Sequence, residues 1–401
     1  MNPLYLSGFG VSLNVDRARL IVKDGFLEPD SGQDTYKLQP RNPGYDSIVI
    51  DGHTGNLTLD AIKWSMRHSM PIFVLDYNGT ILSSILPREP ISSRLKVAQV
   101  VAYEDSAQRL LIARKLIEAK MQRTKGIVEW LSQRYEAAKG IDEQIQKEER
   151  LFTDQHILNG LMMVEGRVAE VYWNLIAKIL PSAYGFKSRI RGSWEMNASD
   201  PANALLNYGY SFLETVCRKH LNAAGLDPTI GFLHEINVSK HPLVYDLQEP
   251  FRWLVDTTVI ESLENREFKQ SDFFRTDNYA LRLKPEAVKK LLSRLRVTFN
   301  STAKYRGKAY RWDTIIFLKT QELARHLLHG APFDISEPSP DLARSDTPEL
   351  RKHLLGLSQS QAKSLGIEKS TLHYLRRHAQ NERPFRVYRK TMNRLNLECV
   401  S

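Results

Sequence analysis

The segment Pro87-Arg88-Glu89-Pro90 marks the point where the hydrophobic pattern of this 401-residue chain changes. Before it, short β-branched apolar runs are separated by glycine-containing turns, a pattern that predicts β-strands. After it, apolar residues recur three and four positions apart, which is the spacing of amphipathic helices. We therefore expect an α+β protein, in which a small, β-sandwich-like N-terminal domain (residues 1–88) precedes a mainly α-helical domain (residues 92–330).

The segments expected in the N-terminal domain are all brief. Asp24-Gly25, Asp51-Gly52 and Asn78-Gly79 provide turns between them. One helix is expected at residues 59–67, where apolar residues have helical spacing ahead of Pro71. The strands are expected at residues 4–6, 11–13, 20–22, 48–50, 72–75 and 81–86.

Helical spacing dominates the next part of the chain. We expect helices over residues 94–135 and 157–180, and further helices as far as Leu328. Residues 329–349 then combine several prolines with Ser and Asp, and this composition is typical of a linker. We expect the linker to span residues 331–349.

The last part of the chain, residues 350–401, carries a predicted helix-turn-helix. Ser358 can cap one short helix and Gly366 can end it, after which Lys369 or Ser370 opens a second, basic helix. An ordinary helical hairpin has the same pattern, but small Ala362, the tight glycine turn and the basic charge favour DNA binding. In such a domain the second helix would enter the major groove, and its candidate DNA contacts are Lys369, Ser370, Thr371, His373, Arg376 and Arg377.

The positive charge of the chain is concentrated in this last segment. Lys and Arg number 56 against 46 Asp and Glu, a net charge of +10. From Arg351 to Ser401 there are eleven basic and three acidic residues, so +8 of that net charge lies in the last 51 residues. A compact basic segment of this kind typically meets a polyanion, because neutralising phosphates releases condensed counterions.

Composition also excludes several classes of protein. No apolar run reaches the roughly 18 residues of a membrane-spanning helix, and Met1–Tyr5 has no secretory signal pattern. Two cysteines, Cys217 and Cys399, cannot form a disulfide framework or a Cys-based zinc site, and they fit a reducing cytosol. Neither a phosphate-binding glycine loop, a Gly-x-Ser-x-Gly elbow nor a His-Glu-x-x-His helix occurs.

Four ionisable residues interrupt apolar segments of the helical part. Glu165 lies within a strongly apolar, aromatic helix, and His234 follows Gly231-Phe232-Leu233. Asp246 and Glu249 lie three residues apart, so they share one helical face. Each residue taken singly also fits a structural role at a solvent edge, in a hydrogen bond or near a helix dipole.

Convergence of these side chains would create a metal site. Two carboxylates and one imidazole suit Mn²⁺ and tolerate Mg²⁺. A divalent ion held there would polarise a phosphodiester and activate a water for cleavage, or a DNA 3′-hydroxyl for strand transfer. Lys240 and Arg252 could hold DNA phosphates nearby, although solvated surface charge explains them equally well.

Four segments, in order, resemble the CRISPR-associated adaptation integrase/endonuclease family. They are Glu165–Trp173 (EGRVAEVYW), Asp200–Tyr210 (DPANALLNYGY), Gly231–His234 (GFLH) and Tyr245–Arg252 (YDLQEPFR). The resemblance covers residues 4–328, including the turn Asp76-Tyr77-Asn78-Gly79. It implies a homodimer formed through the N-terminal β domain, which could assemble as a tetramer on DNA, and a metal-dependent DNA nuclease and integrase in the helical domain.

The same resemblance assigns roles to the candidate residues. Glu165, His234 and Glu249 would be the catalytic residues and the ligands of Mn²⁺ or Mg²⁺, with Asp246 as an acidic neighbour rather than a ligand. The partner would be double-stranded DNA, and the protein is expected to be cytoplasmic, prokaryotic and nucleoid-associated.

The C-terminal extension departs from the CRISPR-linked members, which usually end near the catalytic domain. A linker followed by a basic helix-turn-helix is similar to the casposase branch, whose members insert a mobile element into double-stranded DNA. The favoured interpretation is therefore a casposase-type integrase. The alternatives are a CRISPR adaptation integrase that works with a small partner protein, and a non-enzymatic helix-turn-helix regulator.

Overall fold

The fold is described from a computed structural model in which most of the chain is placed. The residues described are 2–26, 33–76, 79–90, 92–189, 198–236, 240–276, 280–339, 342, 348–381, 385, 387, 391, 394 and 395. None of the described helices is long and apolar enough to cross a membrane.

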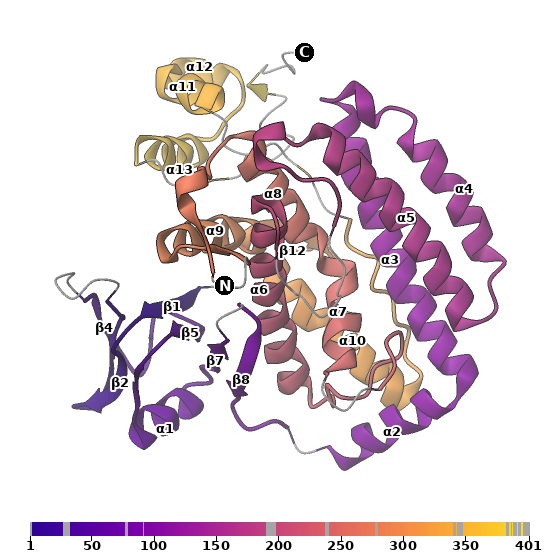
Figure 1. The fold of residues 1–401 in the computed structure, drawn as a ribbon, viewed down its shortest axis with the longest axis horizontal. Helices are drawn as coiled ribbons and strands as arrows, with labels where there is room; N and C mark the ends of the chain where they lie inside the picture. Colours follow the sequence, from indigo (N-terminus) through magenta and orange to yellow (C-terminus); the bar gives the residue numbers. More distant parts are fainter. Residues whose placement is uncertain are drawn as a thin grey trace.

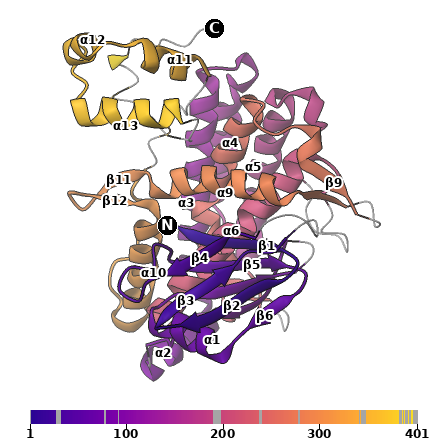
Figure 2. The same ribbon diagram turned by 90° about the vertical axis from the view of Figure 1, so that its left-hand side faces the viewer.

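Two four-stranded sheets form the N-terminal region (Figure 2). The first has the order β1-β5-β7-β8, in which β1, β5 and β7 are parallel and β8 is antiparallel. The second has the order β4-β3-β2-β6. The strands are β1 (Pro3–Gly8), β2 (Val11–Asp16), β3 (Arg19–Lys23), β4 (Thr35–Leu38), β5 (Ser47–Gly52), β6 (Gly55–Leu57), β7 (Ile72–Leu75) and β8 (Ile81–Ile85).

One hydrophobic core joins both sheets and helix α1 (Leu59–Arg67). Leu6 of β1, Leu13 of β2 and Val22 of β3 are fully buried in it, and Trp64 of α1 covers them. The expected N-terminal β region, its six strands and its one helix are confirmed, whereas β4 and β6 were not expected. Of the expected turn at Asp76–Gly79, Tyr77 and Asn78 lie outside the described residues.

Helices make up most of the chain beyond Pro90 (Figure 1). The expected stretch at 94–135 is two helices, because the Asp105 side chain accepts the backbone N–H groups of Ala107 and Gln108 and so starts a new helix. The helices are α2 (Ser93–Glu104), α3 (Ser106–Ser132), α4 (Ile141–Thr153), α5 (Leu158–Ile179), α6 (Pro201–Ala224), α7 (Pro242–Gln248), α8 (Trp253–Glu264), α9 (Pro285–Asn300) and α10 (Trp312–His329).

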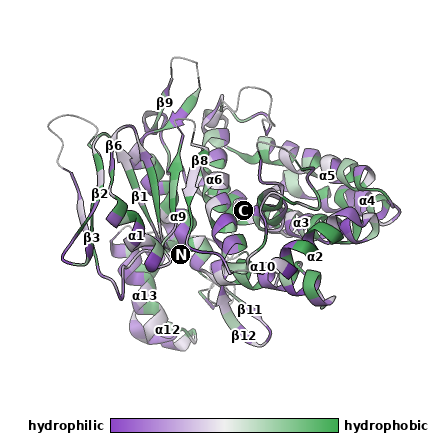
Figure 3. Cartoon of the chain, turned by 90° about the horizontal axis from the view of Figure 1, so that it is seen from below, coloured by the Kyte–Doolittle hydropathy of each residue, from purple (hydrophilic) through white to green (hydrophobic). Residues whose placement is uncertain are grey.

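Shorter elements connect these helices. They are the 3₁₀ helices η1 (Glu136–Ala138), η2 (Ser182–Tyr184), η3 (Glu249–Phe251) and η4 (Gln270–Asp272), the antiparallel pair β9 (Phe273–Arg275) and β10 (Leu281–Leu283), and the hairpin β11 (Thr302–Tyr305) with β12 (Lys308–Arg311). Helices α3, α4 and α5 lie side by side, and green and purple residues alternate along them as in amphipathic helices (Figures 1 and 3). Helix α6 is buried along most of its length.

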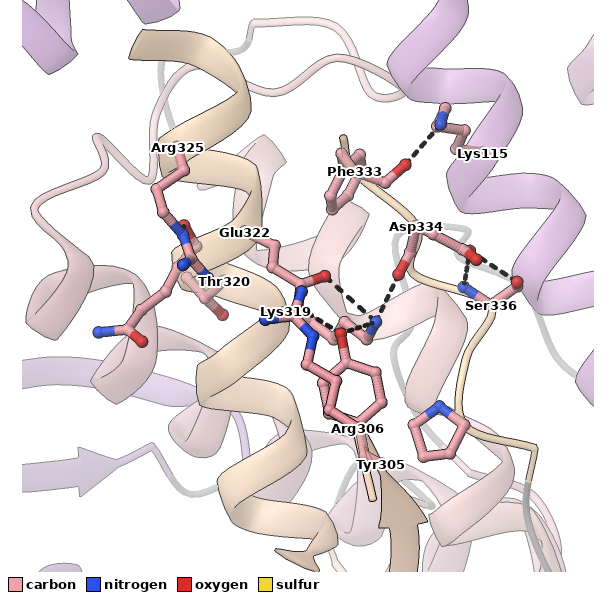
Figure 4. Close-up of polar contacts among 12 residues, drawn as sticks. Lys115, Tyr305, Arg306, Lys319, Thr320, Glu322, Arg325, Phe333, Asp334 and Ser336 are labelled. Atoms are coloured by element: carbon pink, nitrogen blue, oxygen red, sulfur yellow. Dashed lines mark hydrogen bonds and ion pairs between the residues drawn. The ribbon is translucent and has the colours of Figure 1, made fainter. Parts of the chain in front are cut away.

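The first part of the expected linker packs against the helical core (Figure 4). Phe333 and Ile335 are each 2% exposed. Lys115 donates to the carbonyl of Phe333 at 2.5 Å, and Arg123 donates to the carbonyl of Pro338 at 2.7 Å. The structure therefore differs from the expected linker at 331–349, because two apolar side chains and these cationic donors hold residues 333–338 in place. Residues 340, 341 and 343–347 lie outside the described part of the chain.

A buried lysine anchors the same segment from the other side. Lys319 of α10 is 1% exposed and donates to the Asp334 carbonyl at 2.5 Å and to the Tyr305 hydroxyl at 2.9 Å. Its ammonium also lies 3.2 Å from a carboxylate oxygen of Glu322, as Figure 4 shows. These contacts join α10, the β11–β12 hairpin and the segment around Asp334 into one polar cluster.

Three helices follow: α11 (Pro348–Gly356), α12 (Gln359–Ser364) and α13 (Lys369–Gln380). As expected, Ser358 caps α12 by accepting the backbone N–H of Gln361, and Gly366 turns the chain with a φ of 69°. These helices have a hydrophobic core of their own, separate from the other two, which includes Leu354, Leu372 and Leu375. They lie at one end of the molecule in both Figure 1 and Figure 2. The basic residues 383, 386, 389 and 390 lie outside the described residues.

Candidate active site

A cleft of about 930 Å³ lies among helices α3, α5 and α6 and the segment that includes α7, η3 and α8. Glu165 lines it from α5, His234 from the turn before α7, and Glu249 from η3. The three candidate ligands therefore face one cavity, although they come from three separate segments of the chain.

Lys120 of α3 joins the two glutamates of the cleft. Its Nζ atom lies 2.5 Å from Oε1 of Glu165 and 2.5 Å from Oε2 of Glu249. The lysine and Glu165 side chains are 19% and 18% exposed, and that of Glu249 is 9% exposed. The two carboxylates thus share one cation in a half-buried position.

Asp246 organises the turn that carries His234. Its Oδ2 atom accepts the backbone N–H groups of Phe232 and Leu233, and its Oδ1 atom accepts that of His234. Oδ1 also lies 2.7 Å from Nδ1 of the His234 ring. Asp246 is completely buried, and its contact with Nδ1 orients the His234 ring and leaves Nε2 as the nitrogen that faces away from the carboxylate.

Electrostatics in the cleft favour the charged forms of Glu249 and His234. Burial opposes ionisation of Glu249, but the charges of Lys120 and Arg252 outweigh it and lower the pKa of Glu249 to about 2. Burial likewise opposes protonation of His234, yet the hydrogen bond to Asp246 and the nearby carboxylates raise the pKa of this imidazole. Because Glu249 contributes to the raised pKa of His234, the two groups are electrostatically coupled.

Arg252 and Tyr210 form a second layer behind Glu249. The Arg252 Nη1 atom lies 3.4 Å from Oε1 of Glu249, and its guanidinium stacks 3.9 Å from the centre of the Tyr210 ring. The Tyr210 hydroxyl donates to Asp256 at 2.5 Å, and the Tyr172 hydroxyl donates to the other oxygen at 3.3 Å. This layer fixes the position of a cationic group beside the candidate ligand.

The segment Asp200–Tyr210 contributes residues of α6 to the lining of the cleft. Asp200 caps α6 by accepting the backbone N–H of Asn203, and Pro201 occupies the first turn. Arg189 donates to the side-chain oxygens of Asn203 and Asn207 at 2.7 Å each. Asn207 and Tyr210 line the cleft, so this segment belongs to the same site as the acidic segments.

The structure distributes the predicted DNA-binding residues over two places. Lys240 and Arg252 line the cleft. The other six lie on α13 or its first turn, where Lys369, Ser370, His373 and Arg377 are exposed. Arg376 instead donates to the carbonyl of Leu354 at 3.0 Å, so it ties α13 to α11.

Lys120, whose ammonium lies between Glu165 and Glu249, was not among the residues expected from the sequence. A signal for it was present, because Lys120 and Arg123 interrupt the apolar face that Leu116 and Ile127 define on α3 at helical spacing. A cationic side chain on a buried helix face needs a partner, and the partners here are the predicted acidic residues.

The residues of the cleft fit a divalent cation, although they do not already surround one position at metal-binding distances. Among the described residues, no group of three His, Cys, Asp or Glu side chains is close enough to hold an ion as it stands. The Lys120 ammonium, however, occupies a cation position between Glu165 and Glu249. Two carboxylates with an oriented imidazole are the donor set expected for Mn²⁺ or Mg²⁺.

Comparison with known proteins identifies the family. A family model described as CRISPR associated protein Cas1 matches residues 4–296, which include all four candidate residues. The chain belongs to the Cas1 family. Two relatives named CRISPR-associated endonuclease Cas1 agree: one from Archaeoglobus fulgidus is 28% identical, covering 81% of this chain and 96% of the relative, and one from Thermus thermophilus is 29% identical, covering 82% and 93%.

A solved casposase structure resembles the chain over a longer range. It is described as a casposase bound to integration product, with 39% sequence identity and a TM-score of 0.82, covering 89% of this chain and 99% of the casposase chain. That coverage reaches beyond the segment matched by the family model. The chain therefore belongs to the group of Cas1 and casposase integrases and endonucleases, and the family predicted from the four segments is confirmed.

Proposed function

We propose that this protein is a divalent-metal-dependent DNA integrase and endonuclease of the casposase type, which joins DNA ends with a free 3′-hydroxyl to double-stranded target DNA. The observation that carries the proposal is the meeting of Glu165 and Glu249 at one cation position in the cleft that His234 also lines. The 39% identity to a casposase supports this branch of the family.

The candidate residues of the cleft have different parts in the proposed reaction. Glu165, Glu249 and the Nε2 atom of His234 would hold Mn²⁺ or Mg²⁺. The bound ion would polarise the target phosphodiester and lower the pKa of the attacking hydroxyl or water. Asp246 keeps the His234 ring in its orientation, while Arg252 and Lys240 supply positive charge for DNA phosphates.

The C-terminal helices supply a second contact with DNA. We propose that α12 and α13 form a helix-turn-helix, in which the exposed side chains of Lys369, Ser370, His373 and Arg377 face the major groove. Thr371 lies beside them, half-buried. Such a module would let the protein recognise its DNA ends or target without a separate guide, as transposition requires.

The second candidate function is integration of spacers into a CRISPR array together with a small partner protein. The names of the relatives from Archaeoglobus fulgidus and Thermus thermophilus favour it. The two functions share the catalytic cleft and differ in the DNA end that is used. A casposase-type enzyme integrates inverted-repeat ends unaided, whereas an adaptation integrase needs its partner.

The test uses the full-length protein, inverted-repeat oligonucleotides and a supercoiled plasmid in Mn²⁺. We expect plasmid-linked oligonucleotide without any partner protein, and no linkage when the oligonucleotide ends in a 3′-dideoxynucleotide. Glu165→Gln and His234→Asn should each lower strand transfer and cleavage by at least about 100-fold, since each removes a proposed ligand. Glu170→Gln is the matched control, because Glu170 lies on the same helix α5 and is exposed outside the cleft.

Each alternative predicts a different result of this experiment. Linkage that appears only when a small CRISPR adaptation protein is added would favour spacer integration. DNA binding with full retention of cleavage and strand transfer in Glu165→Gln would show that the acidic cluster is structural. A protein that binds DNA but never cuts or joins it would be the non-enzymatic regulator.

We also propose that the N-terminal β region forms a homodimer, and that two dimers assemble on DNA as a tetramer. Sedimentation velocity of the protein alone and with a branched integration product tests both assemblies. The expected masses are two chains without DNA and four chains with it, and a monomer at micromolar concentration would contradict the proposal.

A further inference from the structure

Lys120 is a basic side chain placed where the proposed function requires a metal ion. It lies on the buried face of α3, one helical turn after the fully buried Leu116. Its ammonium is 2.5 Å from a carboxylate oxygen of each of the two glutamates that we propose as ligands. The Lys120 ammonium therefore contacts both proposed acidic ligands at the same time.

The two glutamates need a cation between them in the metal-free protein. Like charges that are held together in a partly buried cleft repel each other strongly, because water screens them poorly there. Arg252 lies 3.4 Å from the Oε1 atom of Glu249, whereas Lys120 lies 2.5 Å from its Oε2 atom. Lys120 is thus the side chain that bridges Glu165 and Glu249.

We propose that Lys120 is a resident counter-cation of the metal site, which holds the metal-free cleft together and competes with the divalent ion for Glu165 and Glu249. The inference rests on the proposed function, since it takes these two glutamates as ligands. A divalent ion held between these two glutamates would take the position that the Lys120 ammonium occupies, and two cations in one position repel each other, so Lys120 leaves that position when the ion binds.

Displacement leaves the lysine available for a second partner. Its side chain lines the cleft and has a flexible four-carbon stem, so the released ammonium can stay within the cleft and pair with a DNA phosphate there. Exchange of the ammonium for a divalent ion keeps a cation between the two carboxylates before and after metal binding. In this arrangement Lys120 is a positioning residue of the metal-free state rather than a metal ligand.

The first test measures binding of Mn²⁺ alone to the full-length protein by isothermal titration calorimetry. Lys120→Met removes the charge and keeps a long apolar side chain. We expect its dissociation constant for Mn²⁺ to be about tenfold lower than that of the unsubstituted protein, which corresponds to about 1.4 kcal/mol of lost competition. Lys125→Met is the matched control on α3, because Lys125 pairs with Glu149 outside the cleft, and its Mn²⁺ affinity should be unchanged.

The second readout is thermal unfolding in a chelator and in saturating Mn²⁺. Without metal, Lys120→Met should unfold at a lower temperature than the unsubstituted protein, because two carboxylates lose their shared cation. Mn²⁺ should remove most of this difference. Lys120→Arg keeps the positive charge and pairs with carboxylates more strongly, so it should bind Mn²⁺ more weakly than the unsubstituted protein does. This variant tests the proposal if Lys120→Met does not fold.

The counter-cation role would be overturned if Lys120→Met bound Mn²⁺ as well as the unsubstituted protein or more weakly. If only Lys120→Arg folds, unchanged Mn²⁺ binding by that variant would overturn the role. Failure of the proposed function gives a different pattern. In that case Glu165→Gln and Glu249→Gln would bind Mn²⁺ as well as the unsubstituted protein does. If both glutamine variants lose Mn²⁺ while Lys120→Met binds as before, the metal site stands and only the inference about Lys120 fails.

Discussion

The Nδ1 atom of His234 lies 2.7 Å from the Oδ1 atom of Asp246, and the same carboxylate accepts three consecutive backbone N–H groups. One buried side chain therefore sets both the path of the turn and the orientation of the ring. A metal-binding histidine usually needs such a partner on its other nitrogen, because the partner fixes the tautomer and the direction of the ligand.

Replacing this carboxylate should disturb both the turn and the ring. The four donors are the backbone N–H groups of Phe232, Leu233 and His234 and the Nδ1 atom of the His234 ring. The asparagine of Asp246→Asn has one acceptor oxygen, so it cannot accept from all four, and its amide N–H groups would point at some of these donors. We expect a loss of about 1–3 kcal/mol of stability and a 10- to 100-fold weaker affinity for Mn²⁺. Urea unfolding and calorimetry measure the two effects.

Asp227→Asn is the control for this substitution. Asp227 also accepts hydrogen bonds within the loop before α7, but they come from the backbone and hydroxyl of Thr229 rather than from the His234 turn. Its effect on Mn²⁺ binding should be negligible. Equal loss of affinity in both variants would mean that general loosening of the loop, and not orientation of His234, limits metal binding.

Metal binding should depend on pH through His234. Burial opposes its charge, but Asp246 raises the pKa of His234 above its ordinary value of 6.5. In the metal-free protein, the stability gained from the protonated ring is fully present below pH 6.5 and is lost as the pH rises through the raised folded-state pKa. Because only the neutral ring can bind a metal, Mn²⁺ affinity should rise over that same range.

Calorimetry in buffers of different ionisation enthalpy measures this linkage as proton release on Mn²⁺ binding. We expect release of up to about one proton below the raised pKa, and little release in His234→Gln. Release that persists unchanged in His234→Gln would assign the proton to another group.

Adjacent arginines on α13 should behave differently. Arg377 is exposed, so Arg377→Ala should weaken DNA binding and lower the salt dependence of binding by about one ion. Arg376 donates to the Leu354 carbonyl, so Arg376→Ala should mainly lower the unfolding temperature. Fluorescence anisotropy at several salt concentrations, with thermal unfolding beside it, distinguishes the two roles. The reverse pattern would contradict the proposed DNA-facing side of α13.

Lys319 should contribute strongly to stability. Lys319→Met leaves Glu322, which is 4% exposed, with Arg306 and the Tyr305 hydroxyl as partners (Figure 4), and we expect a loss of about 3 kcal/mol. Adding Glu322→Gln should recover part of this loss, because it removes the charge of the buried carboxylate that has lost one of its two cationic partners. Urea unfolding measures the change in stability. Lys115→Met is the comparison variant: it removes one hydrogen bond to the Phe333 carbonyl and should lower stability by about 1 kcal/mol. A Lys319→Met protein as stable as the unsubstituted one would show that the anchor is dispensable.

Local patterns predicted the elements better than their arrangement. The β-branched runs at residues 20–22 and 72–75 are strands, but β4 and β6 were missed because their residues are mostly exposed and polar or glycine-containing. The parallel pairing of β1 with β5 joins residues more than 40 positions apart, and no short-range pattern encodes such a contact. The anchored segment around Phe333 was interpreted as a linker because its prolines outweighed its two apolar residues.

Residue order alone was enough to divide the chain at Pro87–Pro90 and to identify the Cas1 family from four short segments, because hydrophobic period and motif spacing are local properties. Only the tertiary structure showed that Lys120 lies between Glu165 and Glu249 and that Asp246 contacts the His234 ring. Lys120 and Glu165 are 45 residues apart, and packing of α3 against α5 brings them together. Long-range packing places charges, and in a half-buried cleft that placement determines which cation the carboxylates can hold.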